Sequence, residues 1–177
     1  PNRRPSIRRC SGVSVLKSPA NAVLFQCGWF ACVLGGDSRW LLIGVAVLGA
    51  HLLWISSWAR EGQVILAVTV LGTLVDTALR GLGVFEFNTP GPLIPLWLIL
   101  LWALLATTLR HCLAWSAQPW WLASLLGAVG GPLSYYAGSQ LAGVSFAYGT
   151  TPTLIGLALL WAMLFPLLHG VAQRLEY

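Results

Sequence analysis

Residues 111–173 decide the fold class, because they run without one formal charge: HCLAWSAQPWWLASLLGAVGGPLSYYAGSQLAGVSFAYGTTPTLIGLALLWAMLFPLLHGVAQ. A transmembrane helix needs about 20 mostly apolar residues. The 63 residues between Arg110 and Arg174 therefore hold two such helices and a short loop. A water-soluble hairpin of this length would carry charged side chains on its outer face. The stretch predicts a membrane hairpin.

The whole chain of 177 residues is likewise apolar and poor in charged residues. Charged residues make up 8% of it (10 Lys or Arg, 5 Asp or Glu), hydrophobic residues make up 57%, and the mean hydropathy is +0.76. A soluble domain carries about 25% charged residues, and a disordered chain has low hydrophobicity. The composition therefore excludes a water-soluble globular enzyme and a disordered chain, and it predicts a polytopic membrane protein.

Six apolar stretches are long enough to cross a bilayer. We expect an all-α membrane bundle of about six transmembrane helices at 20–36, 40–58, 63–83, 92–115, 121–143 and 153–173. The first stretch also resembles the apolar part of a signal peptide, but no A-x-A-like cleavage site follows it. The expected organisation is a basic arm at 1–19, one transmembrane domain at 20–173 and a cytoplasmic tail at 174–177. Pro1 stands where an initiator Met is expected, so the arm is also a candidate for a misassigned start.

The distribution of Lys and Arg predicts that both termini face the cytoplasm, because cytoplasmic loops are enriched in these residues. With the N-terminus inside, the outer side carries Arg39 and Arg80, whereas the cytoplasmic side carries Arg3, Arg4, Arg8, Arg9, Lys17, Arg60, Arg110 and Arg174. Tryptophans at the span ends agree with an interfacial aromatic belt: Trp40, Trp58, Trp115, Trp120 and Trp121.

Neither nucleic acid, nor a metal, nor a cofactor is expected. Half of the positive charge lies in the N-terminal arm rather than on a folded basic module, which excludes nucleic-acid binding. The four cysteines lack CxxC spacing, and no HxxxH, ExxH, HExxH, GxSxG or P-loop motif is present. His51 and His169 are lone histidines on apolar stretches, which is more typical of a hydrogen bond to a neighbour than of a metal ligand.

Asp76 lies inside the third expected span, with Arg80 four residues later. A carboxylate at mid-membrane costs about 2.5–3.5 kcal/mol on insertion scales, so it marks a functional site by default. An acid four residues before a base also favours an ion pair on one helical face. Asp76 is therefore either a functional acid or the structural partner of Arg80.

Residues 121–143 combine a small-residue face with a proline. Small residues recur at steps of three or four and so share one helical face: Gly127, Gly131, Ser134, Gly138 and Ala142. Such a face favours close packing of a neighbouring helix. Pro132 removes one helical hydrogen bond directly after Gly130 and Gly131, and we expect the helix to be broken or kinked there.

Ser134, Tyr135 and Tyr136 follow this point at a depth similar to that of Asp76 in the expected topology. The best candidate polar cluster is therefore Asp76 with Ser134 and with Tyr135 or Tyr136. In this cluster Asp76 is the candidate acid or base, and Tyr135 is a candidate hydrogen-bond donor.

The fourth span ends with Arg110 and His111 near the cytoplasmic surface. These two side chains either anchor the helix at the interface or contact a phospholipid headgroup, and His111 is also a candidate catalytic residue. At 1.5 Å per residue, Asp76 and His111 differ in depth by roughly 10–15 Å, which disfavours a dyad of the two. Gln26 in the first span predicts an interhelical hydrogen bond and is more typical of packing than of substrate contact.

Four features, in chain order, resemble a bacterial inner-membrane family called domain of unknown function 2878: FQCGWFACVLGG at 25–36, Asp76, PLWLILLWALLATTLRHCLAW at 95–115 and LLGAVGGPLSYYAGSQL at 125–141. The resemblance covers about residues 21–173 and implies a small polytopic protein with no assigned activity. It also implies a link to lipid chemistry, because family members are often encoded near enzymes that modify membrane fatty acids. The family-typical positions, none with an assigned role, are Gln26, Trp29, Asp76, His111, Gly131, Pro132 and Tyr135.

Three functions follow as hypotheses. The first is a non-catalytic accessory component of membrane-lipid modification or envelope response, which binds lipids, a helix-packing partner or a second copy of itself. The second is a small intramembrane enzyme that acts on lipid acyl chains or headgroups, with Asp76 as acid or base and Tyr135 or Tyr136 as hydrogen-bond donor. In this hypothesis Arg110 and His111 anchor the phosphate. The third is a small transporter or flippase-like protein that uses a broken helix at 121–143.

Overall fold

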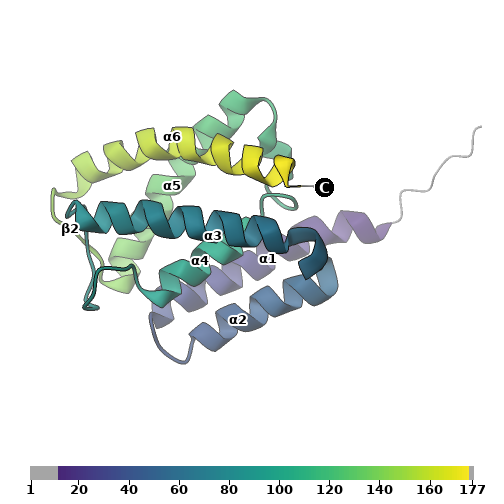
Figure 1. The fold of residues 1–177 in the computed structure, drawn as a ribbon, viewed down its shortest axis with the longest axis horizontal. Coiled ribbons are helices and arrows are strands. Elements are labelled where there is room, and N and C mark those ends of the chain that lie inside the picture. Colours follow the sequence, from purple (N-terminus) through teal and green to yellow (C-terminus); the bar gives the residue numbers. More distant parts are fainter. Residues whose placement is uncertain (1–11, 176–177) are drawn as a thin grey trace, which may run out of the picture.

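The computed structural model describes residues 12–175, and within them the chain forms six α-helices (Figure 1). They are α1 (Gly12–Gly35), α2 (Leu41–Ala50), α3 (Trp58–Gly81), α4 (Leu96–Ala106), α5 (Trp120–Ala142) and α6 (Thr150–Arg174). A π-helix, η1 (His51–Ile55), continues α2, and a 3₁₀ helix, η2 (Ala114–Ala117), precedes α5. The mainly helical fold class is confirmed. Residues 1–11 of the expected basic arm, which include Pro1 and the arginines at positions 3, 4, 8 and 9, lie outside the described residues. Residues 12–19 of that arm form the start of α1 rather than a separate segment.

The helices pack into one bundle. α5 packs chiefly against α6, α3 packs against α4, and α1 contacts both α2 and α4. The first helix begins and the last helix ends at the same end of the bundle (Figure 1). A core of aromatic and aliphatic side chains joins the helices, and Trp102, Leu104 and Leu168 are among its most buried members.

Two short strands close the opposite end. β1 (Phe85–Glu86) pairs antiparallel with β2 (Ser145–Phe146), so the α3–α4 and α5–α6 connections are joined there. Phe85 is buried and its ring stacks on Tyr135 of α5 at 5.2 Å between ring centres. This contact fixes the turn region over the end of the helices. The sequence did not predict these strands.

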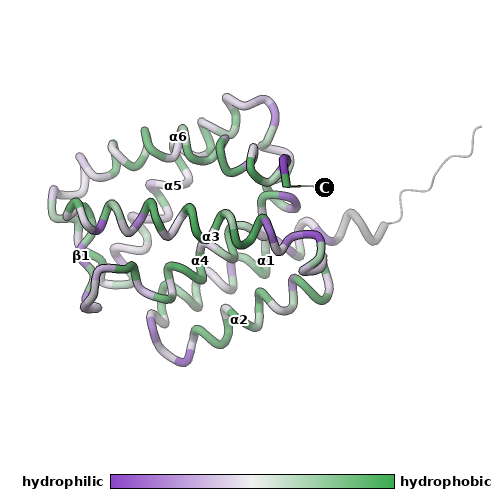
Figure 2. Tube along the Cα trace, viewed as in Figure 1, coloured by the Kyte–Doolittle hydropathy of each residue, from purple (hydrophilic) through white to green (hydrophobic). Residues whose placement is uncertain are grey.

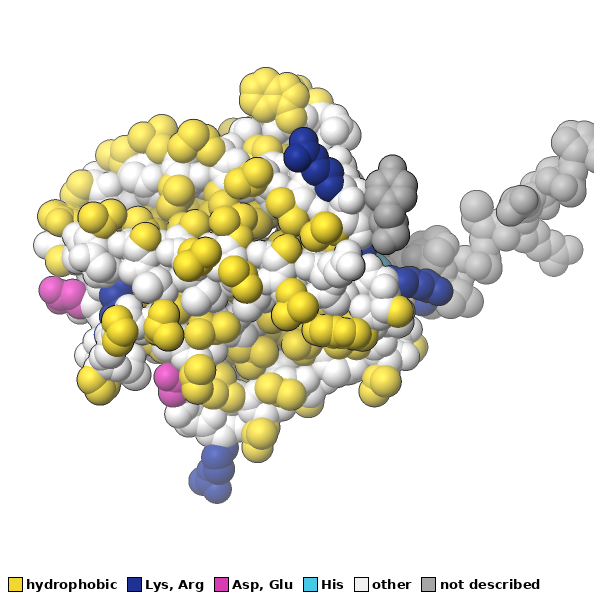
Figure 3. All heavy atoms as spheres, in the orientation of Figure 1, with side chains coloured by type: hydrophobic (Ala, Val, Ile, Leu, Met, Phe, Trp, Pro, Cys, Tyr) yellow, Lys and Arg dark blue, Asp and Glu magenta, His cyan; other side chains and the backbone are white. Residues whose placement is uncertain are grey.

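The helix surfaces are apolar. α3 and α6 are each long and apolar enough to cross a membrane, and α4 and the α2–η1 segment are shorter apolar helices. In Figure 2 hydrophilic segments gather at the turns. On the face drawn in Figure 3, the charged side chains lie towards the edges, and hydrophobic side chains cover the helices between them. Large exposed hydrophobics such as Leu53, Trp54 and Met163 are typical of a surface that faces lipid.

The fourth expected span is wrong in its length. A continuous helix was expected over 92–115, but α4 ends at Ala106, and residues 107–113 form turns. The hydroxyls of Thr107 and Thr108 donate to the carbonyls of Leu104 and Leu105, three residues back, at 2.7 and 2.6 Å. Backbone bonds three residues apart also replace the α-helical pattern here, as in Thr108 to Leu105 at 3.0 Å.

The fifth span was expected to be broken or kinked at Pro132; the break is absent, and the kink stays a prediction. α5 runs from Trp120 to Ala142 as one helix with Pro132 inside it. Pro132 is buried among the neighbouring helices, and tertiary packing holds the helix through the missing hydrogen bond.

Candidate functional site

A cavity of about 500 Å³ lies among α1, α4, α5 and α6. Its lining is mostly aromatic and aliphatic, and its aromatic side chains include Trp29, Trp97, Trp102, Tyr135, Trp161 and Phe165. The β1–β2 pair contributes Phe85 and Phe146. A volume of this size is within the range of pockets that bind small molecules, about 300–1,000 Å³. A lining of this kind favours an apolar ligand over a polar one.

The cavity opens at the molecular surface beside α1 and α5. Gln26, Leu133 and Trp115 line it and are also exposed. Next to this opening, the indole nitrogen of Trp29 donates to the Ser134 hydroxyl at 3.1 Å and so ties α1 to α5. Gln26 thus lies at the entrance, whereas an interhelical packing role was predicted for it.

Asp76 lies behind the cavity wall and does not line it. Its carboxylate has no solvent exposure. The Trp102 indole nitrogen donates to Oδ2 at 2.7 Å, and the Tyr135 hydroxyl donates to Oδ1 at 2.6 Å. Asp76 of α3 therefore holds two wall residues, one from α4 and one from α5, in fixed orientations.

The predicted polar cluster comes together only in part. Asp76 meets Tyr135, but the Ser134 hydroxyl bonds to Trp29, and Tyr136 is 42% exposed.

Arg80 is not the partner of Asp76. Its guanidinium donates to the backbone carbonyls of Leu93 and Thr89, at 2.5 and 2.6 Å, and lies over the Phe87 ring at 5.3 Å. Among residues 12–175 no ion pair joins Arg80 to Asp76. Arg80 instead joins the end of α3 to the α3–α4 connection.

The small-residue face of α5 is covered by α6. A Cβ on Gly127 would overlap the carbonyl oxygen of Trp161, and one on Gly131 would overlap the Trp161 ring. Gly138, on the same face, lines the cavity, and a Cβ there would meet nothing within 4 Å. Gly127 and Gly131 therefore let α6 approach closely, and all three glycines also line the cavity.

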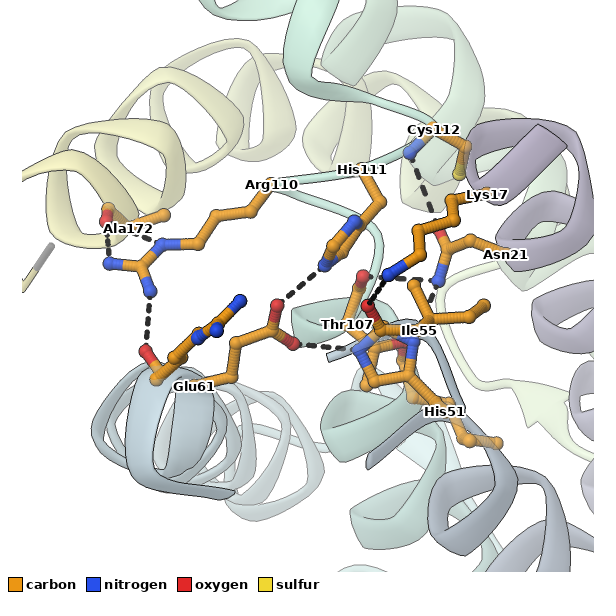
Figure 4. Close-up of polar contacts among 12 residues, drawn as sticks. Lys17, Asn21, His51, Ile55, Glu61, Thr107, Arg110, His111, Cys112 and Ala172 are labelled. Carbon is orange, nitrogen blue, oxygen red and sulfur yellow. Dashed lines mark hydrogen bonds and ion pairs between the residues drawn. The ribbon is translucent and has the colours of Figure 1, made fainter. Parts of the chain in front are cut away.

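A second cluster lies at the opposite end of α3. Asp76 and Glu61 are 15 positions apart on this helix, which is about 22 Å along its axis. Glu61 is 4% exposed, and its two carboxylate oxygens face His51 Nε2 at 2.7 Å and His111 Nε2 at 2.5 Å (Figure 4). His111 thus meets a carboxylate, but it is Glu61 rather than Asp76.

Asn21 of α1 completes this cluster beside His51. Its amide nitrogen donates to the Thr107 carbonyl at 3.2 Å and faces His51 Nδ1 at 3.1 Å, and its amide oxygen accepts from the Cys112 backbone N–H at 3.2 Å (Figure 4). The two backbone partners fix which side of the amide is nitrogen, because a carbonyl only accepts and an N–H only donates. Asn21 therefore donates to His51 Nδ1.

This geometry decides the tautomer of His51. Since Nδ1 accepts a hydrogen bond, the ring proton is on Nε2 and is donated to Glu61.

The three potential ligand atoms of His51, Glu61 and His111 lie within 4.8 Å of one another, a spacing that suits one metal ion. A metal-bound histidine needs its metal-side nitrogen free and normally donates its other N–H to an acceptor. His51 faces a donor at that other nitrogen, so the residues present do not fit a metal centre.

Arg110 is engaged with the protein backbone. Its guanidinium donates to the Ala172 carbonyl at 3.0 and 2.7 Å and to the Arg60 carbonyl at 2.7 Å. Lys17 donates to the Ile55 carbonyl at 3.0 Å, at the end of η1. These two cations close the cluster by satisfying carbonyls at the ends of α6 and η1. A headgroup contact by Arg110 stays a prediction.

Residues 18–167 match the family described as Protein of unknown function (DUF2878). The chain belongs to this family. The resemblance noted from the sequence is therefore confirmed. No curated protein and no solved structure matches the chain.

For this DUF2878 member, sequence reasoning missed the most connected polar group. Glu61 and Asn21 were given no role, and His51 was treated as a lone histidine. One available indication was the position of Glu61, a lone carboxylate two residues before an expected span. The partners of Glu61 could not be found from spacing, since they come from η1 and from the turn after α4.

Proposed function

We propose that this DUF2878 protein is a six-span protein of the bacterial inner membrane that binds the acyl chain of a membrane lipid in its cavity. It acts as an accessory component of membrane-lipid modification. The observation that carries the proposal is the cavity of about 500 Å³, apolar in its lining and open beside α1 and α5. An opening on a helix flank admits a lipid chain sideways from the bilayer.

The charge distribution supports an orientation with both termini in the cytoplasm. Lys17, Arg60 and Arg110 meet at the end of the bundle where α6 also ends. At the other end, Arg39 lies in the α1–α2 connection and Arg80 in the last turn of α3. The positive-inside rule assigns the richer end to the cytoplasm.

The test uses a phospholipid with a diazirine on its acyl chain, reconstituted with the protein in nanodiscs. Irradiation is expected to label cavity-lining residues such as Ser134 and Trp29. Gly138→Leu places a side chain in the cavity without meeting a backbone, and we expect it to reduce this labelling at least several-fold.

Gly170→Leu is the matched control, because a Cβ there also meets nothing within 4 Å and Gly170 does not line the cavity. Labelling of Leu53, which is 90% exposed, reports the surrounding lipids and should not change in either variant. Equal labelling of Ser134 in wild type and Gly138→Leu would show that no chain enters the cavity.

The other two hypotheses differ in their support. The transporter hypothesis depended on a broken helix at 121–143, and α5 is continuous. An enzyme that acts on lipid headgroups is favoured by one observation, the Glu61–His111 pair at the membrane-surface end of the bundle.

A further inference from the structure

The two histidines bound to Glu61 differ in whether a ring nitrogen is left without a hydrogen bond. His51 is 1% exposed and both of its ring nitrogens are hydrogen-bonded, Nδ1 to Asn21 and Nε2 to Glu61. His111 uses only Nε2 toward Glu61, and its side chain is 19% exposed. No hydrogen bond to His111 Nδ1 is formed within residues 12–175, and Figure 4 shows this nitrogen pointing away from Glu61.

The orientation of the Glu61 carboxylate is fixed by its hydrogen bond to His51. Its Oε2 is occupied by a histidine whose tautomer Asn21 fixes, so the carboxylate presents Oε1 to His111 in one orientation. A carboxylate can only accept, so His111 Nε2 carries its proton and Nδ1 keeps a lone pair. This is the relation of carboxylate to imidazole that orients a general base and stabilises its protonated form.

The backbone that carries His51 and His111 departs from a regular α-helix at both residues. His51 begins the π-helix η1, and π-helical turns are rare and frequently found at functional sites. His111 lies in the turn region after α4, and Leu113 and Trp115, which follow it closely, line the cavity. Leu113 shares this turn with His111 and Trp115 follows in η2, so the chain segment that carries His111 also lines one part of the cavity.

We propose that His111 is the proton acceptor of an acid–base site that acts on the polar headgroup of the lipid whose chain occupies the cavity. Glu61 is its positioning residue, and Asn21 and His51 position Glu61. The proposal rests on the lipid binding in the cavity proposed above, and it replaces the non-catalytic accessory role with a catalytic one.

The step assigned to His111 is one proton transfer. The O–H bond of a headgroup hydroxyl breaks, its electron pair stays on the oxygen, and the proton bonds to Nδ1. The resulting imidazolium keeps its Nε2–H hydrogen bond to the Glu61 carboxylate, which stabilises it.

The first experiment maps free imidazole nitrogens with diethyl pyrocarbonate, an acylating reagent, on the full protein in nanodiscs. We expect His111 to be carbethoxylated at least tenfold faster than His51, because only His111 has an unbonded nitrogen within reach. Protein-bound Zn²⁺ is measured on the same preparation. Faster modification of His51, or stoichiometric Zn²⁺ that is lost in H51Q, would overturn the assignment.

The second experiment compares lipid extracts of a deletion strain complemented with wild type, His111→Gln, Glu61→Gln or His169→Gln. His169 is the control: it is a buried histidine on α6 whose Nε2 pairs with Ser116, outside the Glu61 cluster. Loss of the lipid product in the first two variants, with the third active, is expected. Full restoration by His111→Gln, or a deletion strain with unchanged lipids, refutes the proposal.

Acyl-chain labelling separates this proposal from the one on which it rests. His111→Gln should retain diazirine labelling of Ser134, because the cavity does not depend on the imidazole. A protein that loses labelling with Gly138→Leu but keeps its lipid product with His111→Gln binds lipid without acting on it.

Discussion

Replacing Asp76 with asparagine and with leucine separates a structural role from a chemical one. Asparagine can keep both contacts, since its amide oxygen accepts from the Trp102 indole and its amide nitrogen donates to the Tyr135 oxygen. Leucine has a similar size but offers no acceptor, so the indole N–H and the phenol O–H of the cavity wall both lose their partner.

The expected loss follows from these two contacts. Interhelical hydrogen bonds in a membrane protein contribute about 0.6 kcal/mol on average and about 1.7 kcal/mol at most, so losing two costs roughly 1–3 kcal/mol. We expect Asp76→Leu to lower the free energy of unfolding by this amount and Asp76→Asn to leave it within about 0.5 kcal/mol.

The assay is reversible unfolding of the purified protein in mixed micelles, followed by tryptophan fluorescence, together with complementation of the deletion strain. Asp76→Asn should fold and complement like wild type, since Asp76 does not reach the cavity. If Asp76→Asn is as stable as wild type yet fails to complement, Asp76 acts through its proton and the structural interpretation is wrong. If Asp76→Leu loses no stability, the two hydrogen bonds do not hold the wall.

Further predictions concern α5 and the Glu61 cluster. Gly127→Ala should destabilise the protein by about 1–3 kcal/mol in the same unfolding assay, because the new methyl group overlaps a backbone carbonyl of α6. Gly138→Ala should be neutral or stabilising, because the space around Gly138 is open. Asn21→Asp replaces the amide donor at His51 Nδ1 with a carboxylate, while Glu61 still accepts from Nε2, so we expect ¹⁵N NMR of the imidazoles to show His51 protonated on both nitrogens; a His51 ring that still carries its proton on Nε2 alone would show that Asn21 does not set its protonation. Ser134→Ala should lose the bond to Trp29 and cost about 0.6 kcal/mol in unfolding, and a larger loss would show that this contact does more than join α1 to α5.

Most of the helices could be predicted from hydropathy and from the helix-breaking residues between the apolar runs. The expected stretches at 63–83 and 153–173 correspond to α3 and α6, and that at 121–143 corresponds to α5, because each is a long apolar run between turn residues. The stretch at 92–115 was equally apolar, yet its helix ends at Ala106. Asn21 of α1 takes over the Thr107 carbonyl and the Cys112 N–H, which hydropathy alone does not reveal.

Candidate site residues could be predicted from the sequence only where a polar residue stood within an apolar span. Asp76 and Tyr135 stood out as polar groups at similar depth, and the structure joins them at 2.6 Å. The i, i+4 spacing suggested Arg80 as a partner for Asp76, but spacing on one helix ignores the free carbonyls of the next turn, which bind Arg80 instead.

The sequence by itself determined the mainly helical fold class, the family, and the concentration of positive charge in the arm and at a few span ends, since all three depend on composition and local order. Only the tertiary structure decided which polar groups meet. α2 and α4 are apolar on every side, so no hydrophobic stripe says which face turns inward. Their rotation is set by packing against α1 and α3, and that packing brings Asn21, His51, Glu61 and His111 into one buried cluster.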